Sequence, residues 1–233
     1  MILSIHQPSY WPWFGLLDKM AKCDVFVILD HVQLNKDSYQ RRNIFSAHGK
    51  QAYLTIPIHY NLGVKINEAK IRDVEFSAKH YRVLKDWYGK HPFFSDIDRW
   101  IRPIYDRRYE YLKDIVLQTM YASLEAFGIT CRIVLSSDLQ VLGVKSELVL
   151  NICKALDADV YLSGKGAREY FNDEHYQSFK EAKIELMFQK FEHPQYPQYH
   201  AGEFIPGLGC LDYLFNCGLQ ESKNFIKKVQ EGG

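Results

Sequence analysis

The chain has 233 residues, of which 47% are hydrophobic and 24% charged, a composition that is ordinary for a soluble protein with a sizeable core. Its formal net charge of +1 at pH 7 gives no long-range attraction to nucleic acid or to an anionic membrane. It lacks a signal-peptide pattern and an apolar run long enough to span a bilayer. Five cysteines without a CxxC pair argue against a disulfide framework or a zinc site. A cytoplasmic protein is therefore expected.

The first elements predicted are a strand, a helix and a second strand. Residues 2–5 form an apolar run, and Pro8 and Pro12 must end a strand there because proline fixes φ and lacks a donor. Residues 13–22 place apolar side chains at i, i+3, i+4 and i+7, which predicts an amphipathic helix. Residues 25–29 are continuously apolar, as in a strand buried on both faces. Together these elements predict a βαβ unit with parallel, neighbouring strands.

The middle of the chain predicts a change from strands to helices. Residues 53–58 and 71–76 alternate as strands do, and residues 59–67 between them predict a hairpin loop. From residue 78 to residue 128 the periodicity is helical, and Gly128 stands in the position that ends a helix. We interpret residues 78–128 as a helical insert.

The last third repeats the opening organisation. Residues 131–135 predict a buried strand, residues 145–156 a helix and residues 159–162 another strand, which together predict a second βαβ unit. A further strand over residues 183–191 and helices from residue 208 onward complete the chain. The expected fold is a single α/β domain over residues 1–233. Its sheet is mainly parallel, is built from two βαβ units and is flanked by helices, with the helical insert and a short mixed hairpin region added.

Polar residues follow each predicted buried strand. Ligands bind at the carboxyl ends of the strands in open parallel sheets, so these residues predict a site at one edge of the sheet. Any one segment is more simply an ordinary polar strand end, but the convergence of all of them favours a site. The residues concerned are His6, Gln7, Asp30, His31, Gln33, Ser136, Ser137, Asp138, Ser163, Gly164, Lys165 and Gly166.

Three groups of residues, two of them at these strand ends, are suited to a specific chemistry. His6 suits a general base near neutral pH, although a buried histidine bonded to backbone fits the pattern equally well. Residues 163–166 lack the spacing of a Walker A loop. Their glycines could form an anion-binding nest before a helix at residues 167–170, or an ordinary left-handed turn. Lys36 and Arg42 could clamp a phosphate or carboxylate, or belong to a solvated loop.

The sequence resembles the WbqC-like family. Residues 6–19 read His-Gln-Pro-Ser-Tyr-Trp-Pro-Trp-Phe-Gly-Leu-Leu-Asp-Lys, which is similar to the family pattern His-Gln-Pro-x-Tyr-x-Pro-Trp-x-Gly-x-x-Asp-Lys. The resemblance continues through residues 24–33, 147–154, 161–166 and 193–218. One departure is at residues 207–212, where Gly-Leu-Gly-Cys-Leu-Asp replaces the family's Asn-Leu-Ser-Ile-Ile-Asp. The family implies a role in O-antigen or other surface-polysaccharide biosynthesis, such as attaching an amino acid to a sugar.

The first functional hypothesis is an acyl or aminoacyl transferase, for example a glycyl transferase, that forms an amide or ester on a sugar or carrier-bound intermediate. His6 is the expected base and Asp30 orients it, while Gln7 and the backbone of residues 164–166 polarise the carbonyl or hold an anion. Lys165 is expected to bind phosphate or carboxylate together with Lys36 and Arg42. The expected substrate contacts include stacking by two aromatic side chains and polar contacts from several strand ends and loops. These residues are Tyr10, Trp11, Gln33, Lys36, Arg42, Ser163, Gly164, Gly166, His193 and Gln198.

Two alternatives remain open at this point. A fainter similarity to the nucleotidylyltransferase-like fold indicates a nucleotide-dependent activating enzyme, although His6-Gln7-Pro8 lacks the second histidine of the H-x-G-H pattern. The other alternative is a non-catalytic binding subunit of a biosynthetic assembly. The sequence specifies no metal site and leaves the cofactor unknown. The expected partners are a small-molecule or carrier-bound substrate, with a carrier protein and a second copy of the chain as further candidates, and no nucleic acid.

Overall fold

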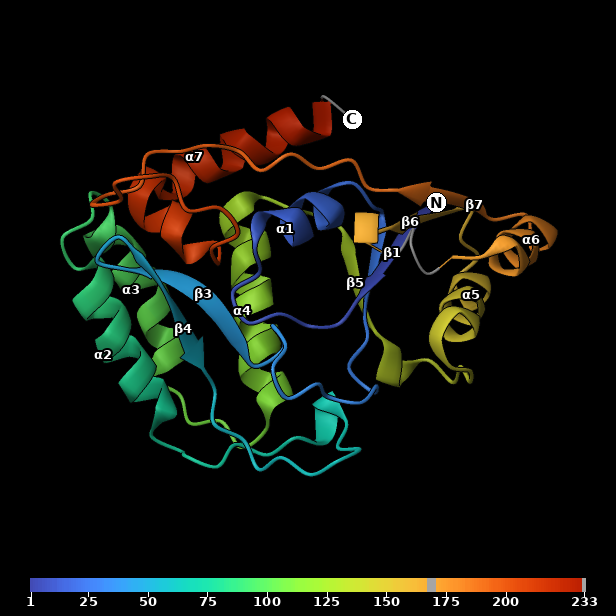
Figure 1. Ribbon diagram of the computed structural model, residues 1–233, viewed down its shortest axis with the longest axis horizontal. Coiled ribbons are helices and arrows are strands. Elements are labelled where there is room, and N and C mark those ends of the chain that lie inside the picture. The colour runs from blue at the N-terminus through green and yellow to red at the C-terminus, as the bar shows by residue number, and fades with distance from the viewer. Residues whose placement is uncertain (167–170, 232–233) are drawn as a thin grey trace.

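The computed structural model describes residues 1–166 and 171–231. In this part of the chain five parallel strands form one sheet in the order β5-β2-β1-β6-β7, which confirms the α/β class (Figure 1). A separate antiparallel pair, β3 and β4, lies beside it. The strand bounds are β1 Ile2–His6, β2 Val25–Ile28, β3 Arg42–Ala47, β4 Lys50–Thr55, β5 Arg132–Leu135, β6 Val160–Ser163 and β7 Glu185–Phe188.

The strand order reverses direction once, next to the first strand. Helix α1 (Phe14–Ala21) joins β1 to its parallel neighbour β2, as the sequence predicts. Helix α5 (Lys145–Ala155) joins β5 to β6, which lie on opposite sides of the β1–β2 pair. The second predicted βαβ unit therefore crosses the sheet instead of pairing neighbouring strands. Helix α6 (Asp173–Glu181) then joins β6 to its neighbour β7.

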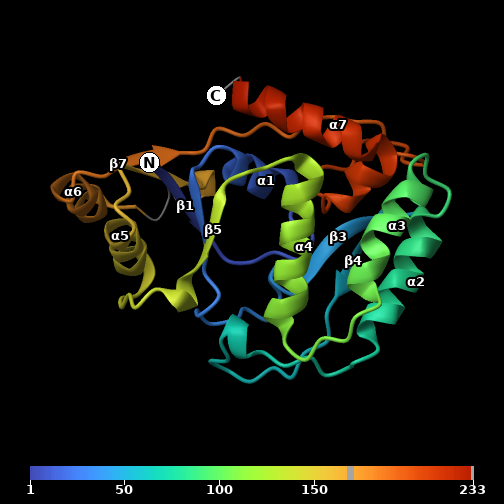
Figure 2. The same cartoon turned by 180° about the vertical axis from the view of Figure 1, so that it is seen from behind.

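Helices cover both faces of the sheet because strand side chains alternate between the two faces. Leu3 and Ile5 of β1 pack in the apolar cluster that includes residues of α5 and α6. Phe26 and Ile28 of β2 pack in a larger cluster with α1, α4 (Leu112–Phe127) and α7 (Leu211–Glu231). Figures 1 and 2 show α5 and α6 at one end of the molecule, α4 near its centre and α7 along its upper side.

The predicted helical insert is present. Helices α2 (Phe76–Tyr88), α3 (Phe94–Tyr105) and α4 occupy the range, and Gly128 ends α4 with φ 66, a left-handed conformation that glycine adopts without strain. The predicted strand over residues 71–76 is absent, and Ile71 forms an isolated bridge with Ile58 instead. The hairpin instead pairs β3 with β4, and the polar residues of β3 hide the apolar alternation by which a strand is predicted.

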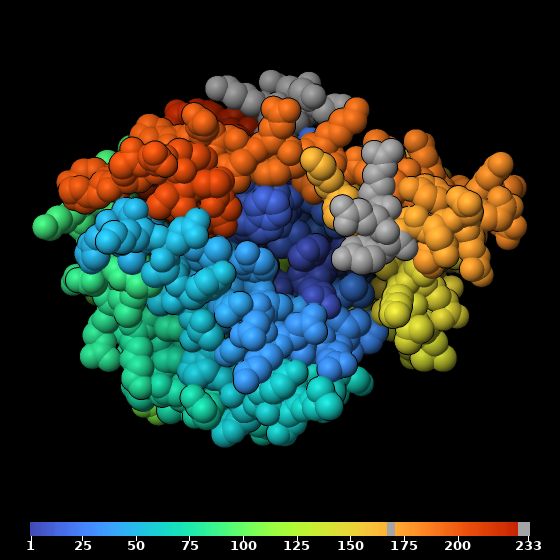
Figure 3. Space-filling view, in the orientation of Figure 1, coloured from blue at the N-terminus to red at the C-terminus, as the bar shows by residue number. Residues whose placement is uncertain are grey.

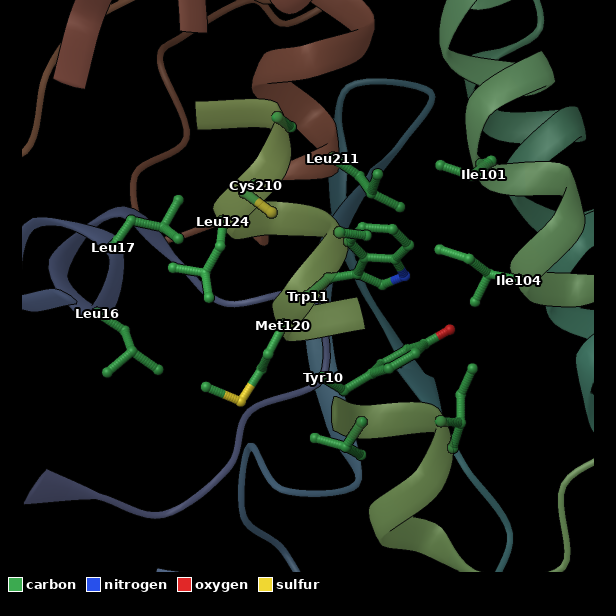
Figure 4. Packing of buried hydrophobic residues seen from close by; sticks show 14 of the residues in the cluster. Tyr10, Trp11, Leu16, Leu17, Ile101, Ile104, Met120, Leu124, Cys210 and Leu211 are labelled. Atoms are coloured by element: carbon green, nitrogen blue, oxygen red, sulfur yellow. The ribbon is translucent and has the colours of Figure 1, made fainter. Parts of the chain in front are cut away.

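Tyr10 and Trp11 belong to the core, which corrects the prediction that they stack on a ligand. Both are fully buried, and Figure 4 shows them beside α4, facing the isoleucines of α3. The Tyr105 hydroxyl lies 2.6 Å from the Tyr10 hydroxyl and accepts from Trp11 Nε1 at 2.7 Å. Trp11 has φ 45, and Asn43 Nδ2 donates to the carbonyl groups of Tyr10 and Trp11 at 2.9 and 2.7 Å. These bonds fix the left-handed turn that carries the ring inward.

The helices and the cysteines show no feature of a membrane span or a disulfide framework in the described residues. No helix there combines the length and apolarity that crossing a bilayer requires. Cys23, Cys131, Cys153, Cys210 and Cys217 are free thiols.

A buried carboxylate in α7 gives the first prediction. Asp212 accepts hydrogen bonds from the Tyr196 hydroxyl at 2.8 Å and the Tyr88 hydroxyl at 3.0 Å, and burial raises its pKa to about 6. Because the folded state favours the protonated acid, the stability that this group contributes is present below its unfolded pKa and is lost as the pH rises through 6. We expect the free energy of unfolding to fall by at most about 3 kcal/mol between pH 4 and pH 7.5 on this account.

Urea unfolding at the two pH values checks this expectation. The Asp212→Asn variant should lack the Asp212 contribution, so wild type minus variant isolates it from the titration of other groups. Equal changes with pH in the two proteins would contradict the raised pKa.

Candidate functional site

A hollow of about 540 Å³, lined by both polar and apolar side chains, lies where the strand order reverses, at the carboxyl ends of β1 and β6. Figure 3 shows N-terminal residues, in dark blue, at the floor of a depression in the centre of the molecule. Open α/β sheets bind ligands at this switch point, and the volume suits a small molecule. Its polar lining includes His6, Lys19, Ser163, Gly164, Lys165 and Gly166. Of the four strand ends that the sequence predicted to converge, those of β1 and β6 line this hollow, whereas the polar residues after β2 and β5 do not. Lys19 was not among the predicted residues.

His6, the last residue of β1, presents a neutral imidazole to the hollow. Its side chain reaches solvent, although protein surrounds the rest of the ring. Nδ1 lies 2.7 Å from the Gln7 carbonyl oxygen, so Nδ1 carries the proton and Nε2 keeps its lone pair. Loss of hydration and the nearby Lys19 ammonium lower the pKa of His6 to about 4. At neutral pH the ring is thus an uncharged proton acceptor that a ligand can reach.

Lys19 contributes a buried amine on the helix side of the hollow. Its side chain is 4% exposed, and Nζ donates to the Ile5 carbonyl oxygen at 2.8 Å. Burial lowers the pKa of the ammonium to about 8. Lysines are rarely buried, so helix periodicity alone does not indicate this position. The Asp-Lys pair of the opening motif was the signal that could have identified it.

The end of β6 forms the opposite wall. Ser163 is buried and Lys165 is exposed. A Cβ added to Gly164 or Gly166 would meet no atom of the described residues within 4 Å, and neither glycine has a positive φ. The left-handed turn considered for this segment is therefore absent, and the two glycines leave open space beside the hollow. The helix considered for residues 167–170 lies outside the described residues.

Two aromatic side chains that sequence reasoning missed line the apolar part of the hollow. The Trp13 indole covers Gly15 so closely that a Cβ there would lie 2.1 Å from the ring. Trp13 also meets Phe191 edge-on, with ring centroids 5.4 Å apart. Gln189 donates to the Gly15 carbonyl oxygen at 2.7 Å and to Asp18 at 2.5 Å. The pairing of Trp13 with a glycine two residues later was the sequence signal for this packing.

Asp30 does not orient His6, which corrects that prediction. It is fully buried, and its carboxylate accepts from Ser136 Oγ at 3.0 Å, Ser137 N at 2.9 Å and Ser137 Oγ at 2.7 Å. Ser136 Oγ also lies 2.6 Å from His31 Nδ1. Because β5 pairs with β2, these groups meet at that end of the sheet and hold β2 and β5 together.

The predicted contacts from residues 7–42 do not line the hollow. Gln7 binds the buried Gln40 through their side chains and so holds the loop after β2. Gln33 is exposed and bridges to Lys65. Lys36 is exposed. Arg42 lies on β3, where it pairs with Asp37 at 3.3 Å and stacks over the Tyr53 ring at 4.5 Å.

His193 and Gln198 shape a loop, and neither lines the hollow. His193 Nδ1 donates to the Pro194 carbonyl oxygen at 2.9 Å, and Nε2 accepts from Gly207 N at 3.0 Å. Gln198 binds both backbone groups of Ile205, at 2.7 and 2.9 Å. Both side chains are therefore occupied in fixing the segment between β7 and α7, in place of the substrate contacts predicted for them.

The strand order defines a doubly wound α/β protein. The hollow is a candidate site at the switch point of its sheet. The chain belongs to the WbqC-like protein family, whose model matches residues 7–224. It is 29% identical over 234 residues to a protein of Mycobacterium tuberculosis (strain ATCC 25618 / H37Rv) described as uncharacterized protein Rv1507c, covering 98% of this chain and 99% of that one. No solved structure matches the chain significantly.

Proposed function

We propose that the protein is a group-transfer enzyme that moves an acyl or aminoacyl group, such as glycyl, to an amine or hydroxyl of a sugar or carrier-bound acceptor. The observation that carries this proposal is the His6 ring in an open hollow at the switch point, where Nδ1 is held by the Gln7 carbonyl oxygen and Nε2 is left to accept a proton. A positioned base of this kind activates a nucleophile by removing its proton, which contributes typically 10²–10⁴-fold to a rate.

In the proposed reaction the acceptor amine or hydroxyl attacks the carbonyl carbon of the donor while His6 Nε2 takes its proton. The bond to the leaving group then breaks, and the imidazolium returns the proton to that group. Lys165 lines the same hollow and provides positive charge for the oxyanion that forms in between. Gln7 has no direct part because it holds the neighbouring loop.

The resemblance to proteins of surface-polysaccharide gene sets supports a place in biosynthesis, and O-antigen assembly in the cytoplasm is the pathway proposed. Attachment of an amino acid to a sugar fits this setting, since the lining of the hollow combines polar groups with the aromatic side chains Trp13 and Phe191. Sugars suit such sites because they present both polar edges and apolar faces.

Replacement of His6 tests the proposal. We expect His6→Gln to keep the fold and to reduce transfer by about 10²–10⁴-fold, because glutamine cannot accept the proton. Glycyl thioesters with amino-sugar acceptors, followed by mass spectrometry, provide the assay. His59→Gln is the matched control, since His59 is exposed and does not line the hollow. Full turnover by a folded His6→Gln protein would exclude His6 as the base. Tight binding of the substrates by wild type without any turnover would instead favour the non-catalytic binding subunit.

A nucleotide-dependent activating enzyme is the second candidate, and the strand order favours it. Doubly wound sheets often bind nucleotides at the switch point, with the phosphates at the first turn of the helix after the first strand. Here that route is altered, because Trp11 turns into the core before α1 and Trp13 covers Gly15. Thermal shift with ATP and Mg²⁺ separates the candidates, since a ligand at a hundred times its Kd adds about 2.7 kcal/mol of stability.

A further inference from the structure

The ammonium of Lys19 has fewer partners than a buried cation needs. The side chain is 4% exposed, so water cannot solvate it as it solvates a surface lysine. A lysine ammonium has three donors, and among the described residues only the Ile5 carbonyl oxygen accepts from it, at 2.8 Å. A carbonyl oxygen satisfies one donor and does not neutralise the charge.

No carboxylate in the described residues supplies the missing negative charge. The adjacent Asp18 directs its oxygens elsewhere, to Lys22 at 3.1 Å and to Gln189 at 2.5 Å. Neither Asp nor Glu occurs in the described lining of the hollow, whose other ionisable groups include His6 and Lys165. Burying a charge without a partner is costly, so a fold that keeps this cation beside an open hollow is prepared for a negative ligand.

We infer that Lys19 Nζ binds a carboxylate or phosphate group of the molecule that occupies the hollow. This inference rests on the proposed function only in taking the hollow as the ligand site. Lys19 stands on the α1 wall and Lys165 on the β6 wall, so an anion entering between them meets positive charge from both sides. The rest of the ligand lies against the aromatic wall formed by Trp13 and Phe191.

The anion is distinguished from the rest of the ligand by paired probes, of which one carries the anionic group and the other lacks it. N-acetylglycine against N-acetylglycinamide tests a carboxylate, and glucose 1-phosphate against glucose tests a phosphate, with titration calorimetry at low salt as the measurement. We expect wild type to bind at least one anionic probe more tightly than its neutral partner. We expect Lys19→Met to weaken that binding by about tenfold or more, because it removes a charge-assisted hydrogen bond.

Lys154→Met is the control, since Lys154 is exposed on α5 and does not line the hollow. The pair that shows the charge effect identifies the source of the anion as a carboxylate or a phosphate. Equal affinity of wild type and Lys19→Met for every anionic probe, or no binding of any of them, would overturn the inference. Turnover does not enter this measurement, so a Lys19-dependent anion site without transfer activity would refute the proposed function alone.

Discussion

Trp11→Ala is expected to lower the free energy of unfolding by about 3–5 kcal/mol, the loss typical of deleting a large buried aromatic side chain. The ring is fully buried, and its removal also takes away the donor that Trp11 Nε1 gives to Tyr105. The substitution would leave a cavity between α3 and α4, where the helical insert packs against the loop after β1. Urea unfolding of both proteins provides the measurement.

Trp13→Ala is the matched comparison because Trp13 is only partly buried and lines the hollow. It should cost less stability than Trp11→Ala, since less apolar area returns to water, and it should change ligand binding instead. If Trp11→Ala left the free energy of unfolding within about 1 kcal/mol of wild type, Trp11 would lack the core role that its burial indicates.

The second large expected effect is stabilisation. Lys19→Met should raise the free energy of unfolding of the ligand-free protein at pH 7 by as much as about 3 kcal/mol. Burial lowers the pKa of Lys19 to about 8, against 10.5 when it is solvated. The folded state therefore disfavours the charged amine that predominates at pH 7, and methionine fills a similar volume without that cost.

The pH dependence has a definite sign. Because the folded pKa is the lower one, wild type should gain stability as the pH rises from 8 towards 10.5, while Lys19→Met should lack that gain. Chemical unfolding at pH 7 and pH 9.5 measures both effects, and Lys154→Met on the surface controls for the change of residue type. A Lys19→Met protein less stable than wild type at pH 7 would mean that the ammonium stabilises the fold.

The sequence predicted the parallel sheet and the position of the hollow because both depend on local patterns. Apolar runs identified the buried strands, and Pro8 showed where β1 stops. The carboxyl ends of β1 and β6 then brought His6 and Ser163 to one place, as expected for parallel strands. The helical insert was equally accessible, since its periodicity is strong and Gly128 marks its end.

The errors concern information that only the tertiary arrangement supplies. Asp30 was expected to contact His6, because local sequence patterns do not reveal the order of strands in a sheet. β5 lies beside β2, so Ser136 and Ser137 donate hydrogen bonds to Asp30 instead. Aromatic side chains that carry a polar group occur both in cores and in ligand sites. The sequence therefore does not show that Trp11 is buried in the core whereas Trp13 lines the hollow. Their burial depends on the left-handed turn at Trp11, which composition does not indicate.

The central place of β1 has a consequence for how the protein is made. Leu3 pairs with Val25 on one side and with Tyr161 on the other, so β1, which is synthesised before β2 and β6, must wait for the second of its two neighbours. At typical rates of synthesis the delay is on the order of ten to thirty seconds. During that time one edge of β1 carries unpaired backbone groups, so nascent chains arrested before β6 should be the form most dependent on chaperones.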